Sequence, residues 1–362
     1  SLVADPEIPV CVAASSAFEQ LGPHADAGIE ELVKILGHQQ EFFRRQAHKT
    51  LLVCSQQSGP EVVKFAIKYL TELQPRRKEE REKDNRSGRR TPPGSKGSSD
   101  EAPVVVVIRM LLTLLCDLKA LVAPHVKVLI PCMEDPNPDI RAPAIRCLIA
   151  AGPEVVSGSG LKLLRKRMES RDVMVSKAAV EVLRGLSPLN PTIAGTIGPV
   201  LWEEPQDTLP ETMRQRSLVL NILGGSGANA KKFLEHIARE MEAADFKVRR
   251  AAMEAFVDLK EHSLPASAEI AKRLIHADPL VRRLTVECVQ LMGPFGAKML
   301  PRVKGLLDTE EDPDVIHAAK RALDGKNGVA SEMLSKPRRA SIGARRASLK
   351  SQRRGGVDTG NT

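Results

Sequence analysis

The feature that most constrains this chain is a short phrase that recurs six times between residues 137 and 316. Each copy has a turn-forming residue, two variable positions and an aliphatic residue, which arginine follows in four of the copies. Successive aliphatic positions are 35, 38, 35, 33 and 34 residues apart; they are Ile140, Val175, Met213, Val248, Val281 and Val315. A period of this length predicts stacked helical repeats, because one such unit cannot bury its apolar face alone.

Each phrase carries the signals that begin a helix. In most copies an Asp or Asn stands where an N-cap accepts hydrogen bonds from backbone amides, and Pro279 and Pro313 follow at the first helical position. The residue four positions beyond the aliphatic one is always small, which lets two helices approach closely; these residues are Ala144, Ala179, Ser217, Ala252, Thr285 and Ala319. Gly152-Pro153 and Gly293-Pro294 predict helix ends.

A second amphipathic segment precedes each phrase, for example at 161–168, 233–241 and 299–307, so one repeat is a helix hairpin. The pattern resembles the HEAT branch of the HEAT/armadillo family through proline in the first helix, the Asp-Pro-x-Val-Arg turn and the Gly-Pro punctuation. The resemblance covers about residues 21–325 and implies an all-α fold, a right-handed α-solenoid of about eight hairpins. Ser176 and Ile316, where arginine is usual, and the proline-rich stretch 187–210 depart from the family pattern.

Charge divides the chain into parts. The formal net charge is +9, and all of it belongs to residues 75–101, with +3, and residues 331–362, with +6. Both stretches are rich in Gly, Ser, Pro and charge, so neither can offset its ordering entropy by burying apolar surface. We therefore expect an N-terminal extension at 1–20 and one solenoid at 21–325, interrupted by a disordered basic loop at 75–101. A disordered basic tail is expected at 326–362.

The most apolar run, residues 103–122, is interrupted by Arg109, Asp117 and Lys119. Its longest uncharged stretch is shorter than the ~20 residues that a membrane span needs, so we predict a buried helix and no transmembrane segment. The six cysteines show no paired spacing, which indicates reduced core thiols and a cytoplasmic protein. The basic run 336–339 leaves a nuclear location as the alternative.

The tail contains the sharpest local motif, an Arg-Arg-Ala-Ser-aliphatic phrase that occurs twice, seven residues apart. It resembles the substrate consensus of cyclic-AMP-dependent and related basophilic protein kinases, whose acidic subsites pair with arginines before the acceptor serine. The arginines expected to direct the kinase are Arg338, Arg339, Arg345 and Arg346. The expected acceptors are Ser341 and Ser348, with Thr91 as a weaker third. Two phosphates would add about −3 to −4 charge and weaken attachment to an acidic partner, or create a docking site for a phospho-reading protein.

No catalytic, metal or cofactor site is predicted. The eight histidines form no His-x-x-x-His pair and the cysteines form no Cys-x-x-Cys pair. The glycine-rich stretch 224–231 lacks the Gly-Lys-Ser/Thr ending of a phosphate loop, and residues 158–160 lack the strand-turn-helix setting of a nucleophile elbow. Both are interpreted as turns.

The arginines of the repeated phrase have two interpretations, because their regular placement would align them along neighbouring repeats. They are Arg141, Arg214, Arg249 and Arg282. In the functional interpretation they form a cationic ladder in a groove that binds an acidic peptide or phosphate. In the structural one, which the neutral charge of the repeats favours, each arginine bridges the turn aspartate of an adjacent repeat and satisfies carbonyls at helix ends.

The sequence thus favours a non-enzymatic scaffold or adaptor that holds a protein partner on a concave face lined by the second helices. Its basic tail would be regulated by phosphorylation. The alternative is an electrostatic binder of an acidic polymer, meaning microtubule acidic tails, nucleic acid or anionic membrane, through the tail and residues 76–90. This alternative requires the tail and depends strongly on salt.

Overall fold

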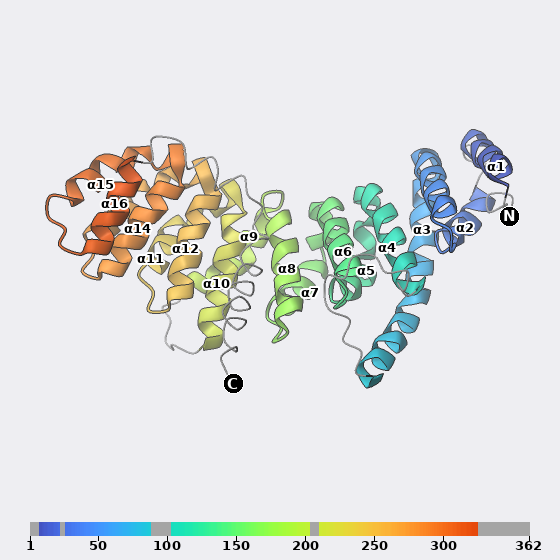
Figure 1. Ribbon diagram of the computed structural model, residues 1–362, viewed down its shortest axis with the longest axis horizontal. Coiled ribbons are helices and arrows are strands. Elements are labelled where there is room, and N and C mark those ends of the chain that lie inside the picture. The colour runs from blue at the N-terminus through green and yellow to red at the C-terminus, as the bar shows by residue number, and fades with distance from the viewer. Residues whose placement is uncertain (1–6, 22–25, 88–102, 203–209, 325–362) are drawn as a thin grey trace, which may run out of the picture. The chain divides into compact units, whose positions relative to one another are not determined.

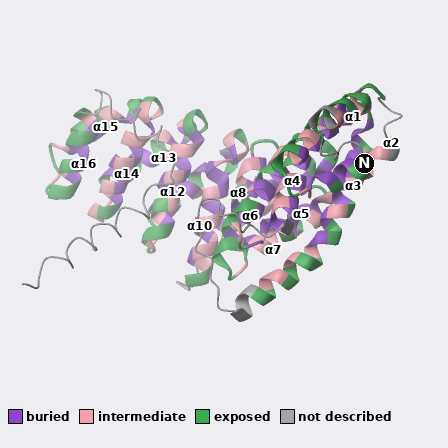
Figure 2. Cartoon of the chain, turned by 45° about the vertical axis from the view of Figure 1, so that its right-hand side comes forward, coloured by how far each residue is buried: buried purple, intermediate pink, exposed green. Residues whose placement is uncertain are grey.

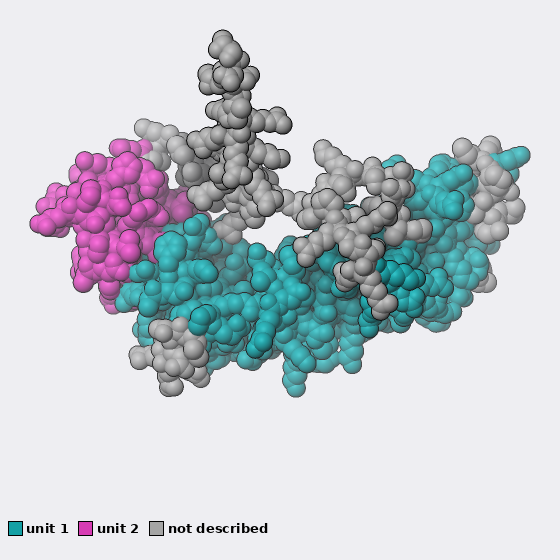
Figure 3. Space-filling view, turned by 60° about the horizontal axis from the view of Figure 1, so that its bottom comes forward, with its two compact units in different colours: residues 1–262 teal, residues 263–362 magenta. Residues whose placement is uncertain are grey.

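The computed structural model describes residues 7–21, 26–87, 103–202 and 210–324, in two compact units, 1–262 and 263–362 (Figure 1; Figure 3). Within these residues the regular elements are α-helices and short 3-10 helices, with no strand, so the predicted all-α fold is confirmed. The predicted tail, 326–362, and residues 88–101 of the predicted loop lie outside the described residues.

Unit 1 is built from helices in pairs. Its α-helices are α1 Ile8–Leu21, α2 Asp26–Ile35, α3 Glu41–Ser87, α4 Pro103–Asp117, α5 Val126–Met133, α6 Pro138–Ala150, α7 Gly160–Met168, α8 Val173–Leu186, α9 Pro191–Ile197, α10 Pro210–Gly224, α11 Leu234–Glu240 and α12 Phe246–Leu259. Short 3-10 helices precede several of them, among them η3 Lys119–His125, η4 Pro153–Val156, η5 Gly198–Leu201 and η6 Gly227–Phe233. Ser58 has a non-helical backbone and breaks α3 into two helices just before Pro60.

The pairs of unit 1 form two layers. α5 packs on α6, α7 on α8, and α11 on α12 as hairpins. The second helices α4, α6, α8, α10 and α12 contact one another in succession and are called the second-helix layer here; α5, α7, α9 and α11 are called the first-helix layer. The helices bury one stripe and expose another, as the purple and green faces of Figure 2 show.

Unit 2 repeats the same hairpin. Its α-helices are α13 Ser267–Lys272, α14 Pro279–Leu291, α15 Leu300–Leu306 and α16 Pro313–Asp324. α15 packs on α16, and the second helices α14 and α16 contact each other.

The predicted helix starts are confirmed. Each of the side chains of Asn137, Asp172, Asp245, Asp278 and Asp312 accepts a hydrogen bond from the backbone amide two residues later. These bonds satisfy amides that have no partner within the helix. The predicted small contact residues are buried, apart from Ser217, which is half-buried. Small side chains at these points let the second helices pack closely.

The apolar run that begins at Pro103 forms α4, where Ile108, Leu111 and Leu115 are buried. The predicted buried helix is therefore confirmed. No helix among the described residues has the length and apolar content needed to cross a membrane. The thiols of Cys54, Cys132, Cys147 and Cys288 are free and buried; burial raises the pKa of Cys132 and of Cys288 to about 12, which keeps both protonated at neutral pH.

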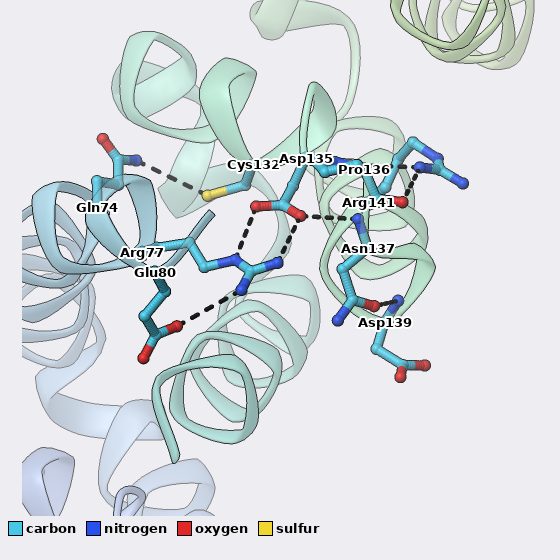
Figure 4. Close-up of polar contacts among 9 residues, drawn as sticks. All are labelled: Gln74, Arg77, Glu80, Cys132, Asp135, Pro136, Asn137, Asp139 and Arg141. Carbon is cyan, nitrogen blue, oxygen red and sulfur yellow. Dashed lines mark hydrogen bonds and ion pairs between the residues drawn. The ribbon is translucent and has the colours of Figure 1, made fainter. Parts of the chain in front are cut away.

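The predicted basic loop begins as a charged helical extension, because α3 remains helical through Ser87. The charged composition of residues 75–87 favoured disorder, but a tertiary contact holds the start of this segment. Arg77 donates from Nε and Nη2 to the two carboxylate oxygens of Asp135, at 3.1 and 3.2 Å (Figure 4). Gln74 donates to the carbonyl of Val128 at 2.7 Å. Asp135 is buried, so its charge requires a partner such as Arg77.

At the other end, the residues predicted as an N-terminal extension include α1. This helix packs against α3, and the Cys54 thiol on α3 lies 3.9 Å from the carbonyl oxygen of Phe18.

Candidate functional site

The predicted arginines mostly contact the protein itself. Arg141 donates from Nη1 to the carbonyls of Asp135 and Pro136, both at 2.9 Å (Figure 4). Arg282 does the same to residues 276 and 277, at 2.8 and 2.9 Å. Arg44, which lies outside the predicted series, makes the same kind of contact: it donates to the carbonyls of residues 38 and 39 at 2.7 and 2.6 Å. In each case the guanidinium closes the turn that leads into its own helix.

Two arginines of the predicted series, Arg214 and Arg282, contact a neighbouring turn. Arg214 donates to the carbonyl of Ser170 at 2.6 Å. Arg282 makes a two-bond ion pair with Glu310, at 2.7 and 2.6 Å, and its hydrogen bonds hold the pKa of that carboxyl below the usual range. Arg249 occupies the equivalent position on α12. These intramolecular contacts favour the structural interpretation of the series over a ligand-binding ladder.

The structure also reveals a second capping position, two residues before the N-cap. The side chains there accept a hydrogen bond from the N-cap amide: Asp135 from Asn137 at 2.8 Å, and Glu310 from Asp312 at 3.0 Å. The same arrangement recurs with His38, Ser170 and His276 as acceptors. A polar residue at this spacing was visible in the sequence, but only the structure assigns it a role.

The described residues contain no group of three or more His, Cys, Asp or Glu side chains that could hold a metal ion. The glycine-rich stretch 224–231 runs from the last residue of α10 into η6, and residues 158–160 form the turn that leads into α7. Both stretches connect helices. The expected phosphorylation and kinase-recognition residues, at 91, 338–341, 345, 346 and 348, lie outside the described residues.

A groove of about 540 Å³ lies between α9 and the segment formed by η4 and α7. Its lining combines two cations, one acid, three hydroxyls and an amide with apolar side chains: Pro153, Glu154, Val156, Ser157, Gly158, Leu161, Lys162, Arg165, Asn190, Thr192 and Thr196. Val156 and Leu161 are buried, so they supply the apolar base. This groove belongs entirely to unit 1 and to the first-helix layer.

Local sequence explains why a groove forms here. Gly158 has a φ of +54°, which glycine adopts without strain, and a Cβ at Gly160 would collide with the carbonyl of Val155. The two glycines therefore allow a tight turn into α7. On the other side, Asn190 caps the short α9 by accepting from the amide of Thr192 at 2.9 Å, and its Nδ2 lies 3.4 Å from the carbonyl of Pro153.

The cations of α7 differ in how they are satisfied. Arg167 pairs with Glu134 at 2.5 Å, and Arg165 pairs through Nε with Glu169 at 3.1 Å. Lys162 and Lys166 are exposed, and neither makes a hydrogen bond or ion pair within the described part of the chain. The sequence predicts the segment 161–168 as an amphipathic helix. It does not identify the cations of this helix as part of a binding site, because the opposite wall of the groove comes from a different repeat.

Known proteins resemble this chain only distantly. No protein-family model matches the chain, and no curated protein matches it. Among solved structures, a chain of the Kap95:Nup1 complex is 14% identical with a TM-score of 0.42; the match covers 90% of the present chain and 44% of that chain. An importin beta chain is 10% identical, with a TM-score of 0.38, over 88% and 48% of the two chains. A chain in a homology model of the full-length AP-3 complex is 17% identical, with a TM-score of 0.40, over 94% and 56%.

The present chain thus spans about half the length of these solved chains or less. The stacked hairpins in each unit confirm that it is an all-α helical-repeat protein.

Proposed function

We propose that this protein is a non-enzymatic helical-repeat scaffold that binds an extended segment of a protein partner in the groove between α7 and α9. The observation that carries the proposal is the groove itself. It has an apolar base on Val156 and Leu161. On its walls, the side chains of Lys162, Thr192 and Thr196 have no hydrogen-bond partner among the described residues. Concave sites of this composition are where proteins bind ligands.

The second-helix layer, which the sequence favoured as the binding face, offers less. Some of its polar side chains bind one another: Arg184 on α8 donates to Asp258 on α12 at 2.6 Å and to Asn221 on α10 at 3.2 Å. Arg250 pairs with Glu254 within α12 at 3.3 Å. A partner on this face would have to break these contacts before making its own.

The tail enters the proposal as a regulator. Phosphorylation of Ser341 and Ser348 by a basophilic kinase would reduce the positive charge of residues 331–362 and so weaken any contact with an acidic surface of the bound partner. The groove would provide specificity, and the tail would adjust affinity.

Site-specific photo-cross-linking tests the proposal. A benzoyl-phenylalanine replaces Thr196 in the groove of the full chain, or Glu181 on the second-helix layer as the matched control, and each variant is irradiated in native lysate at physiological salt. We expect protein adducts from position 196, with and without kinase treatment, and few from position 181. Adducts only from position 181 would move the site to the second-helix layer. Capture that requires the tail and disappears on nuclease treatment or phosphorylation would replace the scaffold with the polyanion binder.

A further inference from the structure

We infer that the groove between α7 and α9 selects an acidic peptide segment, with carboxylates toward α7 and an aliphatic side chain on the apolar base. This inference rests on the proposed scaffold function and adds the chemical class of the ligand. It follows from the donors that line the groove, from the charge around it and from the side chains that the lining lacks.

The α7 wall presents two cations one helical turn apart. Lys162 and Arg165 are three residues apart, so their side chains leave the same face of the helix. Lys162 has no partner among the described residues, and Arg165 uses Nε for Glu169 while its two Nη groups make no contact there. A carboxylate can therefore receive one bond from the ammonium and others from the guanidinium without displacing an internal pair.

The α9 wall presents hydroxyls in place of charge. Thr192 and Thr196 are one turn apart on α9, and neither hydroxyl has a hydrogen-bond partner among the described residues. A hydroxyl can donate to a carbonyl or accept from an amide, so this wall suits the backbone of an extended chain. The side chain of Asn190, by contrast, is already used in capping α9.

The surrounding charge favours an anion. Glu154 is the one acidic residue in the lining, against Lys162 and Arg165. Lys166 is exposed one turn further along α7, and the Nζ of Lys232 lies 3.7 Å from the position of a Cβ at Gly195 on α9. These cations make the groove attractive to carboxylates, whereas Glu154 disfavours a carboxylate at the end formed by η4.

The lining favours peptide over single-stranded nucleic acid. Among the described residues no aromatic side chain lines the groove, so bases would find no stacking surface on this part of the chain. The buried side chains of Val156 and Leu161 instead offer an aliphatic contact, which a Leu, Ile or Val next to the acidic residues would fill.

Fluorescence anisotropy with purified full-length protein tests the inference. The probe is a fluorescein-labelled octapeptide, Gly-Ser-Glu-Glu-Leu-Glu-Ser-Gly, and the comparison peptide has Gln for each Glu. We expect the acidic peptide to bind at least ~10-fold more tightly than the Gln peptide, since each charge-assisted bond contributes on the order of a tenfold change. Lys162→Glu should lower its affinity by a similar factor.

The matched control is Lys177→Glu, which makes the same charge change at an exposed lysine on α8 in the second-helix layer. We expect it to alter affinity less than ~2-fold, because it acts only through the screened overall charge. Equal losses for Lys162→Glu and Lys177→Glu would overturn the site, and equal binding of the two peptides would overturn the acidic class.

The two proposals fail in different ways. If position 196 cross-links a protein but an excess of the acidic octapeptide does not compete, the acidic class is wrong and the scaffold stands. If the octapeptide binds as expected but no protein cross-links at position 196, the scaffold function is wrong and the anion preference stands.

Discussion

The second-helix layer around α8, α10 and α12 and the groove between α7 and α9 use the same kinds of residue in opposite ways. In the former, Arg184 spans α10 to reach Asp258, and Asn221 accepts from it on the way. In the latter, Lys162 and the two threonine hydroxyls have no partner among the described residues. A cation with an acid within reach therefore stabilises the packing of these helices, whereas a cation without one is available to a ligand.

Close packing accompanies the satisfied charges. A Cβ at Gly224 would lie 2.9 Å from the Cα of Ala255 on α12, so α10 and α12 approach at the level of the backbone. Next to it, Gly225 leaves room for the Arg184 side chain to pass. The groove is loosely packed by comparison, because its walls enclose a space of about 540 Å³. We therefore expect substitutions in the first region to change stability and substitutions in the second to change binding.

The largest effect should come from the buried ion pair between Arg216 on α10 and Glu240 on α11. Their side chains are 3% and 4% exposed, and Arg216 also donates to the carbonyl of Val200 at 3.0 Å. Glu240→Gln leaves a buried guanidinium without its counter-charge, so we expect the free energy of unfolding to fall by about 3–5 kcal/mol. Urea unfolding measures it. The double variant Arg216→Met with Glu240→Leu should recover much of the loss, and an unchanged midpoint for Glu240→Gln would contradict the assignment.

A smaller loss should follow Gly225→Ala. The added Cβ would lie 2.5 Å from Cγ of Arg184 and 3.0 Å from its carbonyl oxygen, so the Arg184 side chain, which crosses α10 to reach Asp258, must shift. We expect a cost of about 1–3 kcal/mol in thermal or urea unfolding. Gly305→Ala is the control: no atom lies within 4 Å of its Cβ position on α15, and we expect it to stabilise by about 0.4–1 kcal/mol. Equal effects of the two changes would show that packing against Arg184 is unimportant.

A modest pH effect should come from His48, whose Nε2 is buried and lies 3.6 Å from Asp117. Burial, which outweighs the attraction of Asp117, lowers the pKa of His48 below its ordinary 6.5. The unfolded chain therefore binds this proton more tightly, and folding stability should fall as pH drops through 6.5 toward the lowered pKa. Unfolding midpoints between pH 8 and pH 5 test this. His48→Gln should flatten the slope, and an unaltered slope would rule out His48 as its source.

The smallest stability effect is expected in the groove. Lys162→Glu changes an exposed side chain without a described partner, so the free energy of unfolding should change by less than about 0.5 kcal/mol. Circular dichroism melting of the same preparations used for anisotropy measures this. A large destabilisation would erase the distinction between the two regions, because Lys162 would then serve the fold.

The amino-acid sequence was sufficient to predict the repeat. The N-cap residues Asp and Asn and the prolines of the first helical turn act within one helix, so their positions predict where the helices start. The small residues four positions beyond each aliphatic one act between neighbouring helices, so they predict how closely these helices pack. Arg141 and Arg282 each bind backbone carbonyls five and six residues earlier in the chain. Such short separations are close to the range in which sequence spacing predicts a contact.

Which charged side chains find a partner depends on the tertiary structure. Arg77 pairs with Asp135, 58 residues later in the chain, and this contact keeps the start of a predicted disordered segment helical. Arg184 pairs with Asp258, 74 residues later. The groove likewise needs α7 and α9, whose facing side chains belong to different repeats. Local spacing cannot report such pairings, because the free energy of a charge depends on the groups that the whole fold brings within a few ångströms of it.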